Sequence, residues 1–172
     1  MEETEPYEDN PIILSLDHPK FIQRENGMKK YLKKALEQPF ISFVEAVGKY
    51  EMGIYLIYDD KELLYIGMTE RKGENRLKEI LQGFCKHTFN RKLVDEFLRG
   101  RGYQFRMLSA KNHKRDLIDT GLLTQETLNE VQLEVNNYIK TKLRYKFFEF
   151  RLHQIRQFEH YAISTLWPLY ND

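Results

Sequence analysis

The sequence predicts a mixed α+β domain, and two observations lead to that fold class. Two short runs rich in β-branched and aromatic residues, 53–58 and 63–69, flank a polar stretch at 59–62. This pattern is typical of a β-hairpin with a loop of four or five residues. Apolar residues spaced by three and four positions over 124–143 and 152–166 predict two amphipathic helices.

The length of the chain and the first fifty residues suggest how it is organised. A chain of 172 residues fits one compact domain and is long enough to bury a core. Residues 1–50 are expected to form an N-terminal arm and helical extension, in which a helix over 21–36 ends before Pro39. Residues 51–172 are expected to form the main domain.

Four further segments are interpreted from their patterns. Helices are expected at 74–82 and 90–98, where apolar residues recur at helical spacing and glycines follow. Residues 103–108 alternate between polar and apolar and predict a third strand. Residues 143–150 alternate in part and are compatible with one more strand.

The two strands of the hairpin place particular side chains on each face. Because successive side chains of a strand point to opposite faces, Tyr55 and Ile57 should face one way and Ile54 and Leu56 the other. On the return strand, Tyr65 can face the same side as Tyr55. Two phenolic hydroxyls would then stand on one face, and Gly67 would open space as the chain leaves the hairpin.

The hairpin also carries two tripeptides that resemble a known family. Gly53-Ile54-Tyr55 and Tyr65-Ile66-Gly67 reproduce the name-giving motifs of the GIY-YIG endonucleases. The resemblance implies a GIY-YIG-like domain, with a small three-stranded antiparallel sheet flanked by helices. Beyond such a domain the chain has its N-terminal helical extension and a helical insertion before the last helix, at about 111–150. Segments of this sort carry target recognition in restriction-type members.

The resemblance extends to five residues in the family's order. It implies that Tyr55 acts as general base on the attacking water and that Tyr65 helps to position this water. It further implies that Arg76 contacts the phosphate, that Glu159 binds the metal ion and that Asn171, after the last helix, supports the site. The two tyrosines, Arg76 and Glu159 are expected to converge on one open cleft.

Other positions match the family only in part. His87 resembles a histidine of the homing-endonuclease branch, and a surface histidine in a basic loop is the alternative interpretation. Met68 stands where some members carry a lysine, a role that Arg71 or Lys72 could fill if the loop folds back. Ile80 stands where some members carry a histidine.

The chemistry that the resemblance implies is hydrolysis of DNA phosphodiester bonds with one Mg²⁺ or Mn²⁺ ion per active site. A tyrosine is a poor base at its ordinary pKa of ~10, so Tyr55 needs a nearby cation or a metal-bound water. Mg²⁺ keeps several waters and uses one or two carboxylates plus substrate phosphate oxygens, so Glu159 alone can suffice as its protein ligand. No small-molecule cofactor is expected.

The distribution of charge favours a polyanionic partner. The net charge is only +1, but residues 71–115 contain thirteen Lys and Arg against four Asp and Glu, a local balance of +9. A basic block attracts nucleic acid, although solvated helix faces would give the same pattern. The candidate nucleic-acid-binding residues are Arg71, Lys72, Lys86, Arg91, Lys111, Lys114 and Arg115.

Composition limits the location and leaves two other functions open. The single cysteine, Cys85, suits a reducing compartment, and the acidic N-terminus is no signal peptide, so a cytoplasmic protein without a membrane segment is expected. A nucleus or a virus-infected cell is also compatible with this composition. The alternatives to DNA hydrolysis are a catalytically silent nucleic-acid-binding module of the same fold and a nuclease acting on RNA or branched DNA.

Overall fold

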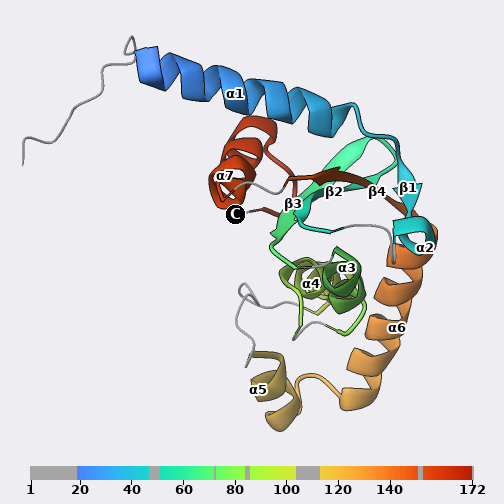
Figure 1. Ribbon diagram of the computed structural model, residues 1–172. Coiled ribbons are helices and arrows are strands. Elements are labelled where there is room, and N and C mark those ends of the chain that lie inside the picture. Colours follow the sequence, from blue (N-terminus) through green and yellow to red (C-terminus); the bar gives the residue numbers. More distant parts are fainter. Residues whose placement is uncertain are drawn as a thin grey trace, which may run out of the picture.

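The computed structural model describes most of the chain, and its helices and strands are shown in Figure 1. The described residues are 19–46, 51–71, 73–83, 86–103, 113–150 and 153–171. The strands are β1 (Ile41–Ser42), β2 (Gly53–Asp59), β3 (Glu62–Thr69) and β4 (Leu143–Glu149). The helices are α1 (Pro19–Leu36), α2 (Phe43–Ala46), α3 (Gly73–Ile80), α4 (Thr88–Gly100), α5 (His113–Asp119), α6 (Gln125–Thr141) and α7 (Ile155–Leu166).

The described strands form one antiparallel sheet in the order β1-β4-β2-β3. The mixed α+β class is confirmed, but the expectation of three strands is wrong because the described residues already form four. The extra strand at 143–150 is confirmed as β4, in which Leu143, Tyr145 and Phe147 are buried alternately. Residues 104–108 of the expected third strand lie outside the described residues.

The hairpin between β2 and β3 is tighter than the sequence predicts. Asp59 pairs directly with Glu62, so the turn consists of Asp60 and Lys61 and the expected loop of four or five residues is wrong. Asp60 adopts a φ of 49°, in the left-handed region that aspartate tolerates better than most residues. This conformation permits a two-residue connection.

A bulge at Leu64 decides which face Tyr65 occupies. Asp59↔Glu62 and Tyr58↔Leu63 are paired in one register, whereas Ile57 pairs with Tyr65, so Leu64 has no residue opposite it. Without this extra residue, Tyr65 would lie opposite Leu56 and point to the other face. The bulge places Tyr65 on the face of Tyr55, as expected.

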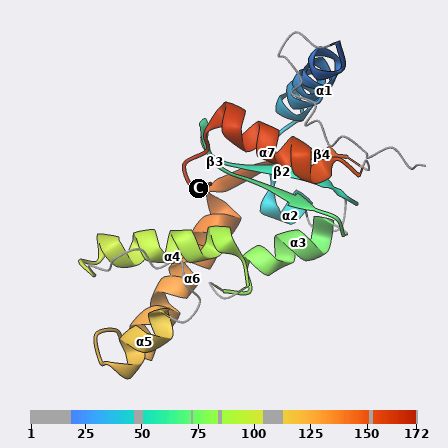
Figure 2. The same ribbon diagram turned by 90° about the vertical axis from the view of Figure 1, so that its left-hand side faces the viewer.

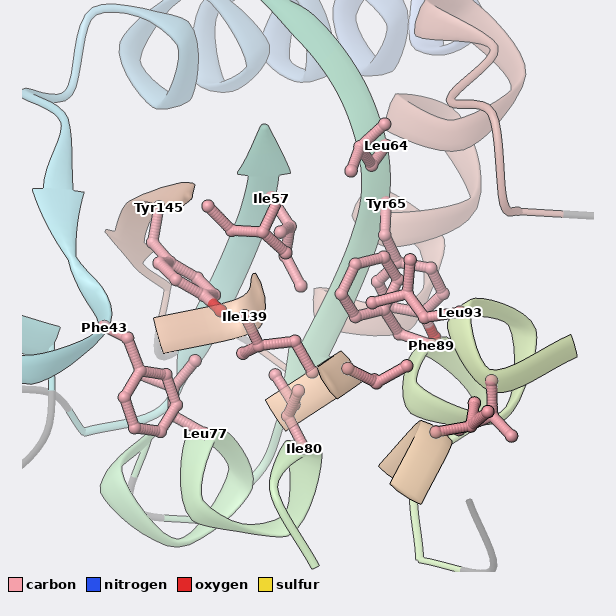
Figure 3. Close-up of a cluster of buried hydrophobic side chains, with 14 of the residues drawn as sticks. Phe43, Ile57, Leu64, Tyr65, Leu77, Ile80, Phe89, Leu93, Ile139 and Tyr145 are labelled. Carbon is pink, nitrogen blue, oxygen red and sulfur yellow. The ribbon is translucent and has the colours of Figure 1, made fainter. Parts of the chain in front are cut away.

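The two faces of the sheet contribute to two separate hydrophobic clusters. The first cluster contains Tyr55, Ile57 and Tyr65 together with side chains of α3, α4 and α6, and Figure 3 shows part of it. The second cluster contains Ile54 and Leu56 together with side chains of α1 and α7. The predicted alternation in β2 is therefore confirmed.

Different helices cover the two faces of the sheet. In Figure 1, α1 and α7 lie on one side of the strands and α3 and α4 on the other, and Figure 2 shows the strands between α7 and α3. Both α6 and β4 fall within the expected insertion at 111–150, yet α6 buries Val131 and Val135 in the first cluster and β4 is an inner strand of the sheet.

Thr124 caps the start of α6. The side chain of Thr124 accepts a hydrogen bond of 3.1 Å from the backbone N–H of Thr127, which satisfies one of the unpaired donors of the first turn. No helix in the described part of the chain is long and apolar enough to cross a lipid bilayer.

Candidate functional site

The hydroxyl of Tyr55 is the centre of the candidate site. Tyr55 lies on β2 and is fully buried, and its Oη is 2.9 Å from Nε2 of His87. The Nε–H of Arg76 donates a second hydrogen bond of 3.3 Å to the same oxygen. β2, α3 and the residue before α4 therefore meet at one phenolic oxygen.

The tautomer of His87 follows from its other contact. The backbone N–H of Phe89 donates to Nδ1 over 3.1 Å, so Nδ1 carries no proton. Burial, reinforced by Arg76 and Arg91, lowers the pKa of His87 to about 3, and the ring is neutral at pH 7. The ring proton therefore lies on Nε2 and is donated to Tyr55.

The alternative of a surface histidine is wrong for His87. Its side chain is only 2 % exposed, and its Nδ1 caps the first turn of α4. Because Tyr55 Oη accepts from both His87 and Arg76, its own proton is left to be donated elsewhere.

Burial dominates the ionisation of the two tyrosines. It raises the pKa of Tyr55 well above the ordinary value of ~10, Tyr65 raises it further, and Arg76 opposes both effects. Burial also raises the pKa of Tyr65. The expected open cleft is wrong at Tyr55, which has 0 % exposure because its ring belongs to the first cluster.

Gly67 is required by the position of the Tyr55 ring. Tyr55 and Gly67 are directly opposite each other across β2 and β3. A Cβ atom at Gly67 would lie 2.3 Å from the Tyr55 hydroxyl oxygen and 2.4 Å from Cζ. The space expected beside Gly67 is therefore filled by the phenol ring, which the missing side chain allows to lie flat against the strand.

Arg76 shares a carboxylate with a second arginine. Its Nη1 is 3.0 Å from Oε2 of Glu79, while Nη2 of Arg71 is 2.7 Å from Oε1 of the same residue. Burial alone would raise the pKa of Glu79, but the hydrogen bonds from Arg76 and Arg71 bring it below its ordinary value. Sequence reasoning missed Glu79, although its position three residues after Arg76 on one helix is the spacing of a helical ion pair.

Glu159 reaches the same region from α7. It is half-buried, and burial raises the pKa of its carboxyl group, while His160, hydrogen bonding to the backbone of Met68 and the charge of Arg76 lower it. Its charge in turn raises the pKa of both Tyr55 and Tyr65. The structure therefore brings Glu159 within electrostatic range of the tyrosines.

Asn171 holds the outer edge of β3. Its Oδ1 accepts a hydrogen bond of 2.7 Å from the N–H of Ile66, and its Nδ2 donates one of 2.8 Å to the carbonyl of the same residue. The N–H of Tyr170 donates to the carbonyl of Leu64 over 2.8 Å. Asn171 thus acts as a ladder partner for β3 beside Tyr65, and the edge strand is covered.

The predicted nucleic-acid-binding residues are only partly brought together. Arg71 lies beside Arg76, and Arg91 is close enough to lower the pKa of His87. Lys86 is exposed before α4, and Arg115 is exposed on α5, which Figures 1 and 2 place at the end of the molecule away from α7. Lys72 and Lys111 lie outside the described residues, as does the side chain of Lys114.

Met68 and Ile80, the two positions that depart from the family's pattern, have uncharged side chains. Ile80 is fully buried in the first cluster, and Met68 is half-buried against the second cluster. Among the described residues, no group of three or more His, Cys, Asp or Glu side chains is placed to hold a metal ion.

No protein-family model matches this chain, and no curated protein and no solved structure matches it significantly. The resemblance to the GIY-YIG endonucleases therefore depends on the residues of the chain itself.

Proposed function

We propose that this protein is a metal-dependent endonuclease of the GIY-YIG type that hydrolyses DNA phosphodiester bonds. The observation that carries the proposal is the Tyr55 oxygen, which accepts hydrogen bonds from Arg76 and His87 while Glu159 approaches the same strands from α7. Two N–H donors on one phenolic oxygen favour its anionic form, which can accept a proton from water, and so oppose the burial that raises the pKa of Tyr55.

The charge on Glu159 fits a single divalent cation. Burial raises the pKa of this carboxyl group, and no described residue forms an ion pair with it, so a cation would relieve the cost of its ionisation. Mg²⁺ or Mn²⁺ bound there would supply positive charge for the phosphate and lower the pKa of a coordinated water. The remaining coordination positions would belong to water and substrate.

Arg76 is proposed to bind the substrate phosphate and to control access to Tyr55. The Arg76 side chain is 29 % exposed, contacts the Tyr55 hydroxyl and forms an ion pair with Glu79. A phosphate group would compete with Glu79 for the guanidinium. Movement of Arg76 toward the phosphate would uncover the Tyr55 oxygen, to which His87 remains hydrogen-bonded.

Plasmid cleavage in the presence of Mg²⁺ or Mn²⁺ tests this proposal. We expect Glu159→Gln and Tyr55→Phe each to lower the cleavage rate by about 10²-fold or more, because each removes a group that acts in the transition state. Glu126→Gln is the matched control, since Glu126 is an exposed glutamate on α6, and it should cleave like the wild type. A wild type that cuts no faster than Glu159→Gln with either metal contradicts the proposal.

The full burial of Tyr55 favours one other function, a catalytically silent module that binds nucleic acid. Such a module would show salt-sensitive binding without turnover. A panel of duplex, flap, junction, single-stranded DNA and RNA separates this alternative from a nuclease that acts on RNA or on branched DNA.

A further inference from the structure

Helix α1 has the strongest one-sided charge of the described elements and has no role in the proposed chemistry. It carries six bases, Lys20, Arg24, Lys29, Lys30, Lys33 and Lys34, against the single acid Glu25. Lys29 forms an ion pair with Glu25 over 2.8 Å, and Lys33 with Glu37 over 3.8 Å. Within the described chain, Arg24, Lys30 and Lys34 form no ion pair, and all three are exposed.

Most of the exposed side chains of α1 are polar, with Ile22, which is 43 % exposed, as an exception. Leu32 and Ala35 are buried in the second cluster, and Met28 packs against it. Both buried residues lie in the second half of the helix. In the first half of α1, Lys20 and Arg24 are exposed, and Figure 1 shows the start of the helix extending beyond α7.

An open groove of about 460 Å³ lies between α1 and the start of α7. Its lining includes Gln23, Arg24 and Gly27 on one side and His153, Gln154 and Gln157 on the other. None of its described lining residues is acidic. A Cβ atom at Gly27 would have no neighbour within 4 Å, so another chain can approach the α1 backbone closely at this point.

We propose that α1 and this groove bind the sugar–phosphate backbone of duplex DNA, as a second contact surface for the substrate of the proposed nuclease. The inference rests on the proposed action on DNA. Guanidinium, ammonium and amide groups are the side chains that contact phosphate and sugar oxygens without reading sequence. With 18 residues, α1 is about 27 Å long, which is comparable to one turn of B-DNA.

The observations favour DNA over an anionic membrane. A membrane-surface helix must insert an apolar face, and the apolar face of α1 is packed against the sheet in the second cluster. Apart from Pro19 and Ile22, the exposed side chains of α1 are cationic or carry an amide. A polyanion whose charges stay hydrated is the better complement to such a surface.

The test compares two variants that each remove three positive charges. The first is Arg24→Gln/Lys30→Gln/Lys34→Gln on α1. The matched control is Arg99→Gln/Lys140→Gln/Lys142→Gln, which changes exposed residues at the ends of α4 and α6. Binding to a fluorescently labelled duplex is measured by anisotropy with EDTA present, from about 50 to 200 mM salt, and circular dichroism checks that both variants are folded.

We expect the α1 variant to bind at least about tenfold more weakly and to lower the slope of log K against log salt by about 2 to 3, since each phosphate contact contributes about 0.9. The control should change the affinity by less than about threefold. A wild type that does not bind the duplex overturns the proposal, as does an α1 variant whose slope equals that of the control. If the α1 substitutions weaken binding to phosphatidylserine vesicles but leave binding to the duplex unchanged, the proposal is also overturned.

The binding result is independent of the nuclease result. Because the assay contains no divalent metal and requires no turnover, loss of binding in the α1 variant supports the surface even if no cleavage is found. Conversely, the wild type could cleave DNA in a way that depends on Glu159 while the α1 variant keeps the salt slope of the wild type. This result would support the proposed function and contradict the proposed DNA-binding surface on α1.

Discussion

The two faces of the sheet are both buried but differ in what they bury. The face in contact with α1 and α7 packs apolar side chains, such as Ile54, Leu56 and Phe158, into the second cluster. The opposite face places the hydroxyls of Tyr55, Tyr65 and Tyr145 inside the first cluster. One strand, β2, contributes to both faces through alternate residues.

The difference lies in how fully the tyrosines are enclosed, because Tyr55 and Tyr145 in the first cluster are fully buried, whereas Tyr58 in the second cluster is 8 % exposed. The Tyr55 hydroxyl has two hydrogen-bond partners, whereas the buried hydroxyl of Tyr145 has none in the described part of the chain. An unsatisfied buried hydroxyl costs about 1–3 kcal/mol. The unpaired hydroxyl of Tyr145 therefore makes the first cluster less stabilising than it would be with an apolar side chain at this position.

The largest effect is expected from truncating the apolar face. Phe158→Ala should lower the free energy of unfolding by about 3–5 kcal/mol, because Phe158 is fully buried among Tyr31, Phe148 and Phe150. Tyr145→Phe, at an equally buried position on the other face, should be neutral or stabilising by about 1 kcal/mol, since it removes only an unpaired hydroxyl. Urea denaturation measures both, and equal losses would show that the faces do not differ in this way.

A smaller effect is expected where the polar face requires close packing of the backbone. Gly67→Ala should destabilise by about 2–3 kcal/mol, because its Cβ atom would lie 2.3 Å from the Tyr55 oxygen and the buried ring must move. The control is Gly27→Ala in α1, where a Cβ atom meets nothing within 4 Å and the helix should gain about 0.5–1 kcal/mol. Thermal unfolding measures the stability of both variants relative to the wild type. If Gly67→Ala is as stable as the wild type, the close contact between Gly67 and Tyr55 is absent.

The smallest effect is expected in the pH dependence of stability. The pKa of His87 is lowered to about 3 in the folded protein from ~6.5 in the unfolded chain, so the unfolded chain binds more protons between these values. The stability from neutral His87 is complete above about pH 6.5 and is lost as the pH falls toward 3. His87→Asn keeps a side chain suited to capping α4 but does not titrate.

Between about pH 6 and pH 4, the free energy of unfolding of His87→Asn should fall less steeply than that of the wild type, by up to about 1.4 kcal/mol per pH unit. Near pH 7 the variant should be about 1 kcal/mol less stable, because it loses the hydrogen bond to Tyr55. Identical slopes in urea titrations would show that His87 is not buried in its neutral form.

Much of the fold could be predicted because its signals are local. The hairpin, the strand at 143–150 and five of the described helices (α1, α3, α4, α6 and α7) follow from spacing and alternation within a few residues, whereas no helix was expected at α5. The loop length was wrong because the left-handed conformation of Asp60 depends on how the two strands pair. The number of strands was wrong because β1, only two residues long, becomes a strand by pairing with β4.

The candidate site was predictable in its residues but not in its contacts. Tyr55, Arg76 and Glu159 stand out in the sequence, and they do approach one another. The burial of Tyr55 and the ion pairs of Glu79 were not foreseen, since both depend on how α3 and α4 pack against the sheet.

The sequence by itself determined which side chains of β2 share a face and which titratable groups are available to the site. Only the tertiary structure decided that Tyr65 joins Tyr55, because the single extra residue at Leu64 shifts the register of β3. It also decided that His87 is a neutral donor to Tyr55, because burial and the N–H of Phe89 select one tautomer. Alternation along a strand is a local property, whereas register, burial and protonation depend on neighbours that are distant in the chain.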